Sequence, residues 1–128
     1  MNEELFIQFA SWVDRILLDP GFTPAVAYNF NLYDHEDAFA MQLISAPSYD
    51  ASDDDWACDM TFSSGEDLFE LPHSIVSSDW RKGLREAKLL IKRYLAKGKE
   101  AACLKAGVAV AVGFVGGDLK VVYLRADA

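Results

Sequence analysis

The sequence has 128 residues, of which 52% are hydrophobic and 12% aromatic, and it carries a formal net charge of −8 at pH 7. A chain of this size and composition buries enough apolar surface to offset the entropy of ordering it, which excludes a disordered chain and predicts one domain over residues 1–128. The longest apolar run, residues 107–117, is too short to cross a bilayer, and the acidic N-terminus does not resemble a signal peptide, so we expect a cytoplasmic protein.

Residues 2–18 predict an amphipathic helix. Apolar side chains recur at spacings of three and four residues from Leu5 to Leu17, and Asn2 is a suitable N-cap. Asp19-Pro20-Gly21 then ends the helical pattern.

The period changes to two after this helix. Residues 26–33 and 39–44 alternate in the manner of two strands, which predicts a hairpin with its turn at 34–37. We expect a third strand over 56–62, with Trp56 on its buried face, and a short fourth strand over 68–71.

Residues 79–97 predict the second main helix, capped by Ser78 or Asp79 and ended by Gly98. Its apolar stripe begins at Trp80, and seven basic side chains cover the rest of its surface. Residues 100–105 are ambiguous and could add a helical turn. Residues 108–115 and 119–124 predict a final hairpin with a glycine-rich turn.

This order of elements predicts an α+β fold. We expect a single antiparallel sheet of about five to six strands packed with two main helices, because runs of neighbouring strands between helices are typical of that class.

No catalytic or metal-binding motif is present. Cys58 and Cys103 lack the spacing of a zinc site or a disulfide framework, so we expect two buried free thiols. The chain's two histidines, His35 and His73, fall in predicted turns outside any triad motif. The aspartates near residue 54 lack the glycine and the distal glutamate of a calcium loop. We therefore predict no catalytic residue, no metal site and no cofactor.

Charge is divided unevenly along the chain. Residues 1–79 hold sixteen acidic side chains and one basic side chain, whereas residues 80–128 hold eleven basic and four acidic ones. The densest acidic stretch is SYDASDDDWACD, residues 48–59, which we call the acidic loop. The basic helix could contact phosphates, but a pI of about 4.6 favours a solvated helix face, so we expect neither a nucleic-acid nor a membrane partner.

The acidic loop has two interpretations. It could be a solvated loop that keeps a neighbouring edge strand soluble, or it could bind a cationic partner that relieves the repulsion among its carboxylates. In a small acidic α+β chain, the segments NLYDHEDAFAMQLIS, DDDWACDMTF and VAVGFVGGDLKVVYL resemble bacterial immunity proteins of polymorphic or contact-dependent growth-inhibition toxin systems. The resemblance implies a non-enzymatic inhibitor that binds one cognate toxin, often a basic nuclease.

Charge, and not the resemblance, predicts the contact residues. These are the five aspartates of the acidic loop with Tyr49 as an apolar anchor, followed by two acidic residues further along the chain: Asp50, Asp53, Asp54, Asp55, Asp59, Tyr49, Glu66 and Asp67.

Two alternatives stay open. One is a small enzyme or ligand-binding domain with a pocket between sheet and helices and with Cys58, His35 or His73 at its mouth. The other is a homodimer formed through an exposed face of the final hairpin, and the chain is therefore expected to be a monomer or a homodimer.

Overall fold

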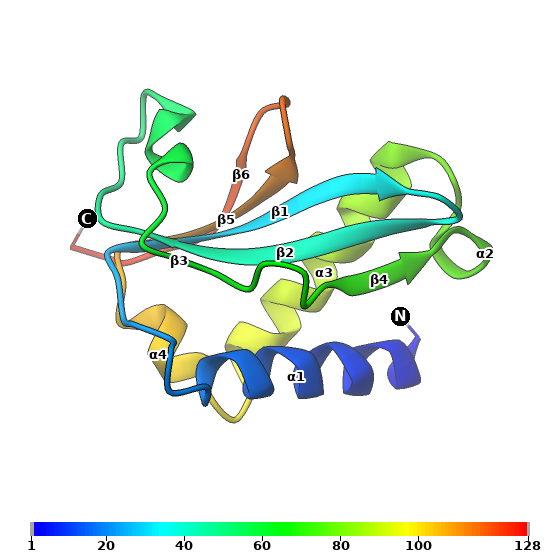
Figure 1. The fold of residues 1–128 in the computed structure, drawn as a ribbon, viewed down its shortest axis with the longest axis horizontal. Coiled ribbons are helices and arrows are strands. Elements are labelled where there is room, and N and C mark those ends of the chain that lie inside the picture. The colour runs from blue at the N-terminus through cyan, green and yellow to red at the C-terminus, as the bar shows by residue number, and fades with distance from the viewer. Residues whose placement is uncertain (1, 128) are drawn as a thin grey trace.

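The computed structural model describes residues 2–127, which form a mixed six-stranded sheet with helices packed against one of its faces (Figure 1). The predicted α+β class is therefore confirmed. Among the described residues, no helix is both long and apolar enough to cross a membrane. The strands are β1 Ala27–His35, β2 Ala38–Ala46, β3 Phe62–Ser63, β4 Phe69–Pro72, β5 Ala109–Phe114 and β6 Lys120–Leu124. The helices are α1 Glu3–Leu17, the 3-10 helix η1 Asp54–Cys58, α2 His73–Val76, α3 Trp80–Lys97 and α4 Ala101–Lys105.

The β1–β2 hairpin forms the centre of the sheet. Its strands pair antiparallel over nine residue pairs, from Ala27 opposite Ala46 to His35 opposite Ala38. The predicted hairpin is confirmed, and its turn is shorter than expected, because only two residues separate the paired strands. Glu36 in that turn has a φ of 59°, the left-handed conformation that tight hairpin turns require.

One strand pair differs from the predicted antiparallel sheet. The strand order is β3-β2-β1-β5-β6, with β4 also paired to β2, and every pair is antiparallel except β1–β5. β5 runs parallel to β1 because α3 carries the chain back across the sheet before β5 begins, and parallel strands require such a crossover. The correction concerns this one pair.

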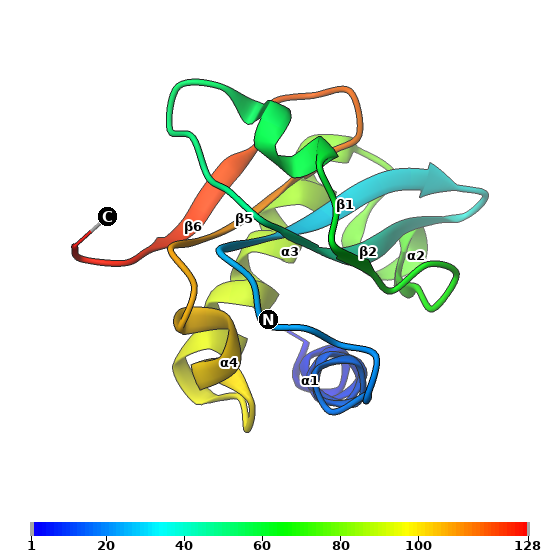
Figure 2. The same cartoon turned by 60° about the vertical axis from the view of Figure 1, so that its left-hand side comes forward.

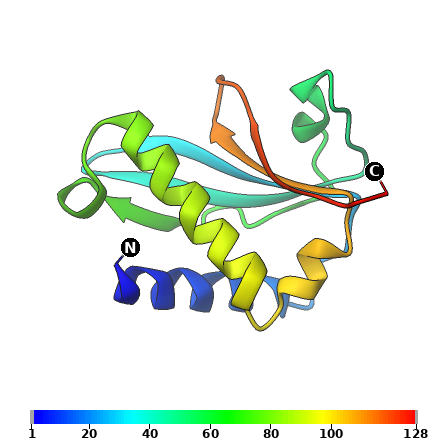
Figure 3. The ribbon, with the colours of Figure 1, turned by 180° about the vertical axis from the view of Figure 1, so that it is seen from behind.

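Helices α1 and α3 lie against one face of the sheet (Figure 3). Large buried side chains of the sheet and of these helices form the core. Alternate residues of β1, namely Tyr28, Phe30 and Leu32, are fully buried on this face. Helix α3 crosses the sheet closely at Gly83, where a Cβ atom would lie 2.5 Å from the ring of Phe39. Helix α3 therefore packs directly on the sheet at Gly83.

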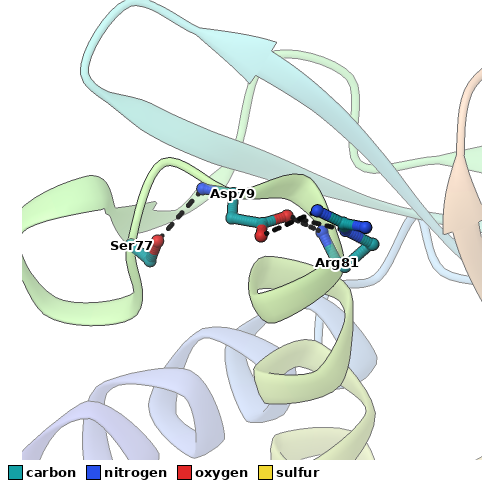
Figure 4. A network of polar contacts seen from close by, with 3 residues as sticks. All are labelled: Ser77, Asp79 and Arg81. Carbon is teal, nitrogen blue, oxygen red and sulfur yellow. Dashed lines mark hydrogen bonds and ion pairs between the residues drawn. The ribbon is translucent and has the colours of Figure 1, made fainter.

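Helix α3 begins and ends where the sequence predicts. Figure 4 shows the Asp79 carboxylate accepting hydrogen bonds from the Arg81 backbone N–H at 3.0 Å and from its guanidinium at 3.2 and 3.3 Å. The Asp79 N–H in turn donates to Ser77 Oγ at 3.1 Å. Asp79 is thus the N-cap, and Gly98 follows the last helical residue.

The predicted strand over residues 56–62 is wrong. Residues 54–58 form η1, and only Phe62–Ser63 pairs with β2. The Asp53 side chain accepts from the Asp55 N–H, and Asp54 and Asp55 occupy the first turn, where carboxylates favour a helical start over an extended strand. The predicted fourth strand is confirmed as β4. The ambiguous residues 101–105 form the short helix α4, and the short helix α2 was not predicted.

Tyr94 joins three helices in the buried layer. Its hydroxyl donates to Asp14 Oδ1 of α1 at 2.5 Å and accepts from the Glu100 N–H before α4 at 3.1 Å. Burial and the hydrogen bond to Asp14 raise the pKa of Tyr94, which keeps this hydroxyl protonated in the folded chain.

The substitution Tyr94→Phe is expected to lower the free energy of unfolding by about 2 kcal/mol, because it leaves the Asp14 carboxylate and the Glu100 N–H without their partner. Urea unfolding at pH 7 measures this loss. Tyr123→Phe is the matched control, since its exposed hydrogen bond to the Lys105 carbonyl is replaced by water. Equal losses in both variants would contradict the joining role of Tyr94.

The raised pKa of Tyr94 also predicts a dependence on alkaline pH. A tyrosine whose pKa is higher in the folded chain stabilises the fold fully below its ordinary pKa of 10.0, and this contribution is lost as the pH rises through the folded value. The free energy of unfolding of the wild-type protein should fall more steeply above that pH than that of Tyr94→Phe. Parallel pH profiles for the two proteins would argue against this origin.

Candidate functional site

The acidic loop lies on the sheet face opposite helix α1, which Figure 2 shows from the side. Trp56 fixes it there, since this side chain is only 6% exposed and packs on Ala27, Ala46 and Ala111 from three adjacent strands. Tyr49 is half-buried with its ring centroid 5.5 Å from that of Trp56. The prediction that Trp56 is buried is confirmed, although it is buried from a 3-10 helix and not from a strand.

Three of the loop's aspartates also shape its backbone. Asp50 Oδ1 accepts from the Ser52 N–H at 2.9 Å and from its hydroxyl at 2.8 Å, and these hydrogen bonds lower the pKa of Asp50. Asp53 caps η1, and Asp54 Oδ2 accepts from the Leu119 N–H at 3.0 Å. The hydrogen bond between Asp54 and Leu119 holds the loop next to the start of β6, so the loop has a defined shape and position.

The five aspartates of the acidic loop are exposed, and none of them has an ion-pair partner within residues 2–127. The basic helix α3 contributes cations to other contacts. Arg93 of α3 pairs with Glu3 of α1 at 2.6 Å, and Arg81 pairs with Asp79. The five carboxylates of the acidic loop thus have no ion-pair compensation among the described residues.

Glu66 and Asp67 occupy different surroundings. Asp67 pairs with Arg15 at 2.7 Å, and its carbonyl accepts from the Trp12 indole N–H of α1, so it does not join the aspartates of the loop. Glu66 is exposed and lies close enough to Tyr33 that its charge, together with burial, raises the pKa of that tyrosine.

A chain of side-chain amides crosses the sheet face that carries the loop. Asn29 Nδ2 donates to Asn31 Oδ1 at 2.6 Å, Asn31 Nδ2 donates to Gln42 Oε1 at 3.1 Å, and Gln42 Nε2 donates to the Gly65 carbonyl at 3.0 Å. Asn29 is fully buried, and its Oδ1 has no hydrogen-bond partner among the described residues. A buried acceptor without a donor is uncommon in a folded protein.

A groove of about 510 Å³ lies between this amide chain, η1 and the β5–β6 turn, and we call it the sheet-face groove. Gly113 allows the turn to curl over the sheet, because a Cβ atom there would lie 2.7 Å from the Asp118 carbonyl oxygen. No lysine, arginine or histidine is among the residues that line it: Asn29, Asn31, Asp54, Asp55, Ala57, Cys58, Met60, Phe114, Val115, Gly116, Gly117 and Leu119.

A second groove, of about 520 Å³, lies on the other side of the same turn. Trp80 and Leu84 of α3 and Phe114 of β5 contribute its apolar surface. Trp80, predicted to begin the apolar stripe of its helix, is 55% exposed at the first residue of α3, where its ring forms a T-shaped pair with that of Phe114.

The structure does not assemble a cysteine–histidine pair. Cys58 lies in η1, whereas His35 pairs with Glu70 and His73 lies near Asp34 at the opposite end of the sheet (Figure 1). Cys58 is exposed and Cys103 half-buried, so the predicted burial of both thiols is wrong. Cys58 is exposed because η1 replaces the strand that would have turned it inward. Within residues 2–127, no group of three or more potential ligands could hold a metal ion.

Neither a family model, nor a curated protein, nor a solved structure matches this chain. Function therefore has to be argued from the chain's own surface chemistry. Asn29, Asn31 and Gln42 are not among the predicted site residues, although asparagine is depleted in strands and two asparagines in one strand are a sign of a polar function.

Trp56→Ala tests whether this side chain holds the acidic loop. It should lower the free energy of unfolding by about 3 kcal/mol and speed hydrogen exchange at the Leu119 amide, which Asp54 protects, while leaving the β1–β2 amides protected. Trp80→Ala, an exposed tryptophan, is the control and should change stability by less than about 1 kcal/mol. An unchanged Leu119 exchange rate in Trp56→Ala would show that other contacts hold the loop.

Proposed function

We propose that this protein is a non-enzymatic inhibitor that neutralises one cationic protein, of the kind represented by a bacterial nuclease toxin, by binding it stoichiometrically through the acidic loop. The observation that carries the proposal is the set of five exposed aspartates without an ion-pair partner in residues 2–127, on the face opposite the helical layer. Under this proposal the protein acts in the cytoplasm, where the toxin's substrate lies.

The electrostatic repulsion within the acidic loop supports this proposal. Three consecutive carboxylates, Asp53 to Asp55, repel one another, and no cation of residues 2–127 forms an ion pair with them. A docked basic surface would relieve it. Such a surface would also be attracted over a distance of about one Debye length, which raises the association rate.

Apolar groups beside the loop favour a protein partner over a simple counter-ion. Tyr49 is half-buried next to Trp56, and Met60 is 52% exposed where it borders the sheet-face groove. An apolar centre within a charged rim is the usual arrangement at protein interfaces. Glu66 extends the acidic rim, whereas Asp67 is a weaker candidate for a contact because Arg15 already neutralises it.

The test begins with the product of the gene adjacent to this one. Co-expression should restore growth to cells that produce it, and the two purified proteins should form a 1:1 complex. Affinity should fall as salt is raised from 50 to 300 mM, in proportion to the screening of the charged contacts. A complex whose affinity does not change with salt would exclude the acidic loop as the main contact.

The triple variant Asp53→Asn, Asp54→Asn, Asp55→Asn should weaken the complex at least about 30-fold at 50 mM salt, since close interfacial charge pairs contribute on the order of 1.5 kcal/mol or more. Asparagine keeps an acceptor oxygen for the cap of η1 and for the Leu119 N–H, so the loop retains its shape. The control is the equally charged variant Glu4→Gln, Glu36→Gln, Asp37→Asn, which changes exposed acids outside the loop. Equal weakening in both variants would reduce the effect to net charge and contradict a defined contact.

A further inference from the structure

We infer that the sheet-face groove is a binding site for one guanidinium group carried on an alkyl chain, and that an arginine side chain of the partner supplies it. The second part rests on the proposed function, whereas the site itself does not. The juxtaposition that carries the inference is an unpartnered buried amide oxygen, two carboxylates without an ion-pair partner among the described residues, and an apolar wall around one groove.

The hydrogen-bond direction in the amide chain is fixed by its far end. The Gly65 carbonyl can only accept, so Gln42 must present its NH₂ group there and its oxygen to Asn31. Asn31 must then present its oxygen to Asn29, which in turn donates from Nδ2. Asn29 Oδ1 is consequently the last atom of this hydrogen-bonded series of amides, and it is an acceptor. Flipping any one amide would place two oxygens or two NH₂ groups against each other.

The sheet does not require a polar side chain at position 29. The neighbouring strand carries Ala111 at the same level of this face, and it packs there as an apolar residue. A buried polar group without a partner costs about 1–3 kcal/mol relative to a satisfied one. The amide oxygen of Asn29 has no partner among the described residues, and Asn29 lines the groove, so a small movement of this side chain would let a donor seated in the groove satisfy it.

The lining of the groove matches a guanidinium group in particular. Its polar side chains, chiefly Asn29, Asp54 and Asp55, offer oxygens, and Asp55 has no hydrogen bond from its carboxylate to the described residues. A guanidinium has five donors in one plane and is more weakly hydrated than an ammonium group, so it satisfies several acceptors at a partly buried site. Leu119, Met60 and Val115 provide apolar surface for the alkyl chain.

Other occupants fit less well. A metal ion needs several ligand groups close together, and the described residues contain no such cluster of histidine, cysteine or carboxylate side chains. An anion would face two carboxylates without a cation in the lining. The volume of about 510 Å³ lies within the range of sites that hold a side chain or a small molecule.

The direct test uses butylguanidinium chloride and ¹⁵N NMR at constant ionic strength. Saturable shifts are expected in the side-chain NH₂ resonances of Asn29 and Asn31 and in the Leu119 amide, with dissociation constants on the order of 1 mM, a usual value for so small a ligand. Butylammonium should bind at least about fivefold more weakly, because it has fewer donors. The absence of saturable shifts, or equal shifts with sodium chloride, overturns the site.

Two variants with a matched design separate binding from structure. Asn29→Val removes the buried oxygen without a partner together with the Nδ2 donor to Asn31, and Ser45→Ala removes a buried hydroxyl without a partner on the opposite face of the sheet. Asn29→Val should abolish the butylguanidinium shifts of Asn31 and Leu119 in a variant that still unfolds cooperatively, whereas Ser45→Ala should keep them. If Asn29→Val does not fold, the exposed variant Asp55→Asn must weaken binding at least threefold, and unchanged binding there overturns the site.

The source of the guanidinium is tested with the partner. Asn29→Val should weaken the complex with the adjacent gene's product about tenfold, the loss expected for a charge-assisted hydrogen bond, and Ser45→Ala should not. If butylguanidinium binds but Asn29→Val leaves the complex unchanged, the assignment to a partner's arginine is overturned. The proposed function is then judged separately, by the salt dependence of the complex and by the aspartate triple variant.

Discussion

The packing of Trp56 on three alanines is the contact on which the rest of the candidate site depends. Three alanines on adjacent strands are small enough to leave a flat surface on which the indole packs: Ala27, Ala46 and Ala111. Because Trp56 is in the middle of η1, its burial fixes the position of Asp54 and Asp55, the two residues that precede it in the same helix. The hydrogen bond from Leu119 to Asp54, and with it the wall of the sheet-face groove, follows from that position.

The sheet separates two surfaces of opposite character. The face toward the helices carries large side chains such as Tyr28 and Phe30, whose burial requires helices α1 and α3. The opposite face of the same strands carries mainly alanine, glycine and amide side chains, with Ile44 and Tyr33 as its larger residues. Charge follows the same division, since basic α3 lies on the first side and the acidic loop on the second.

Hydrophobic periodicity predicts correctly those elements in which many apolar residues recur at one spacing. The β1–β2 hairpin and helices α1 and α3 each present many apolar residues at one spacing, so a single misplaced residue does not alter the pattern. Residues 56–62 have the alternation of a strand, but three aspartates at residues 53–55 come directly before them, and the capping at Asp53 favours a helical start. The wrong prediction that Cys58 is buried follows from the wrong assignment of these residues to a strand.

Other features depend on which strands become neighbours, and this cannot be read from one sequence. The parallel pairing of β1 with β5 joins residues about eighty positions apart, and the final hairpin by itself is compatible with either direction. The amide chain requires the register of Asn31 with Gln42 and the position of Gly65 beside them. The acidic loop was predictable as a candidate from charge, whereas the groove beneath it was not.

Under the proposed function, the loop and the groove have different effects on recognition. The exposed aspartates attract any basic surface, and interactions of this kind mainly raise the association rate and weaken as salt is added. The groove discriminates by geometry, because a planar donor that reaches Asn29 Oδ1 removes the cost of a buried unsatisfied acceptor, and a lysine or a simple ion does so less well. Unpaired acceptors reject partners that lack the matching donor, so the same oxygen that costs the free protein stability would make the inhibitor selective for one partner.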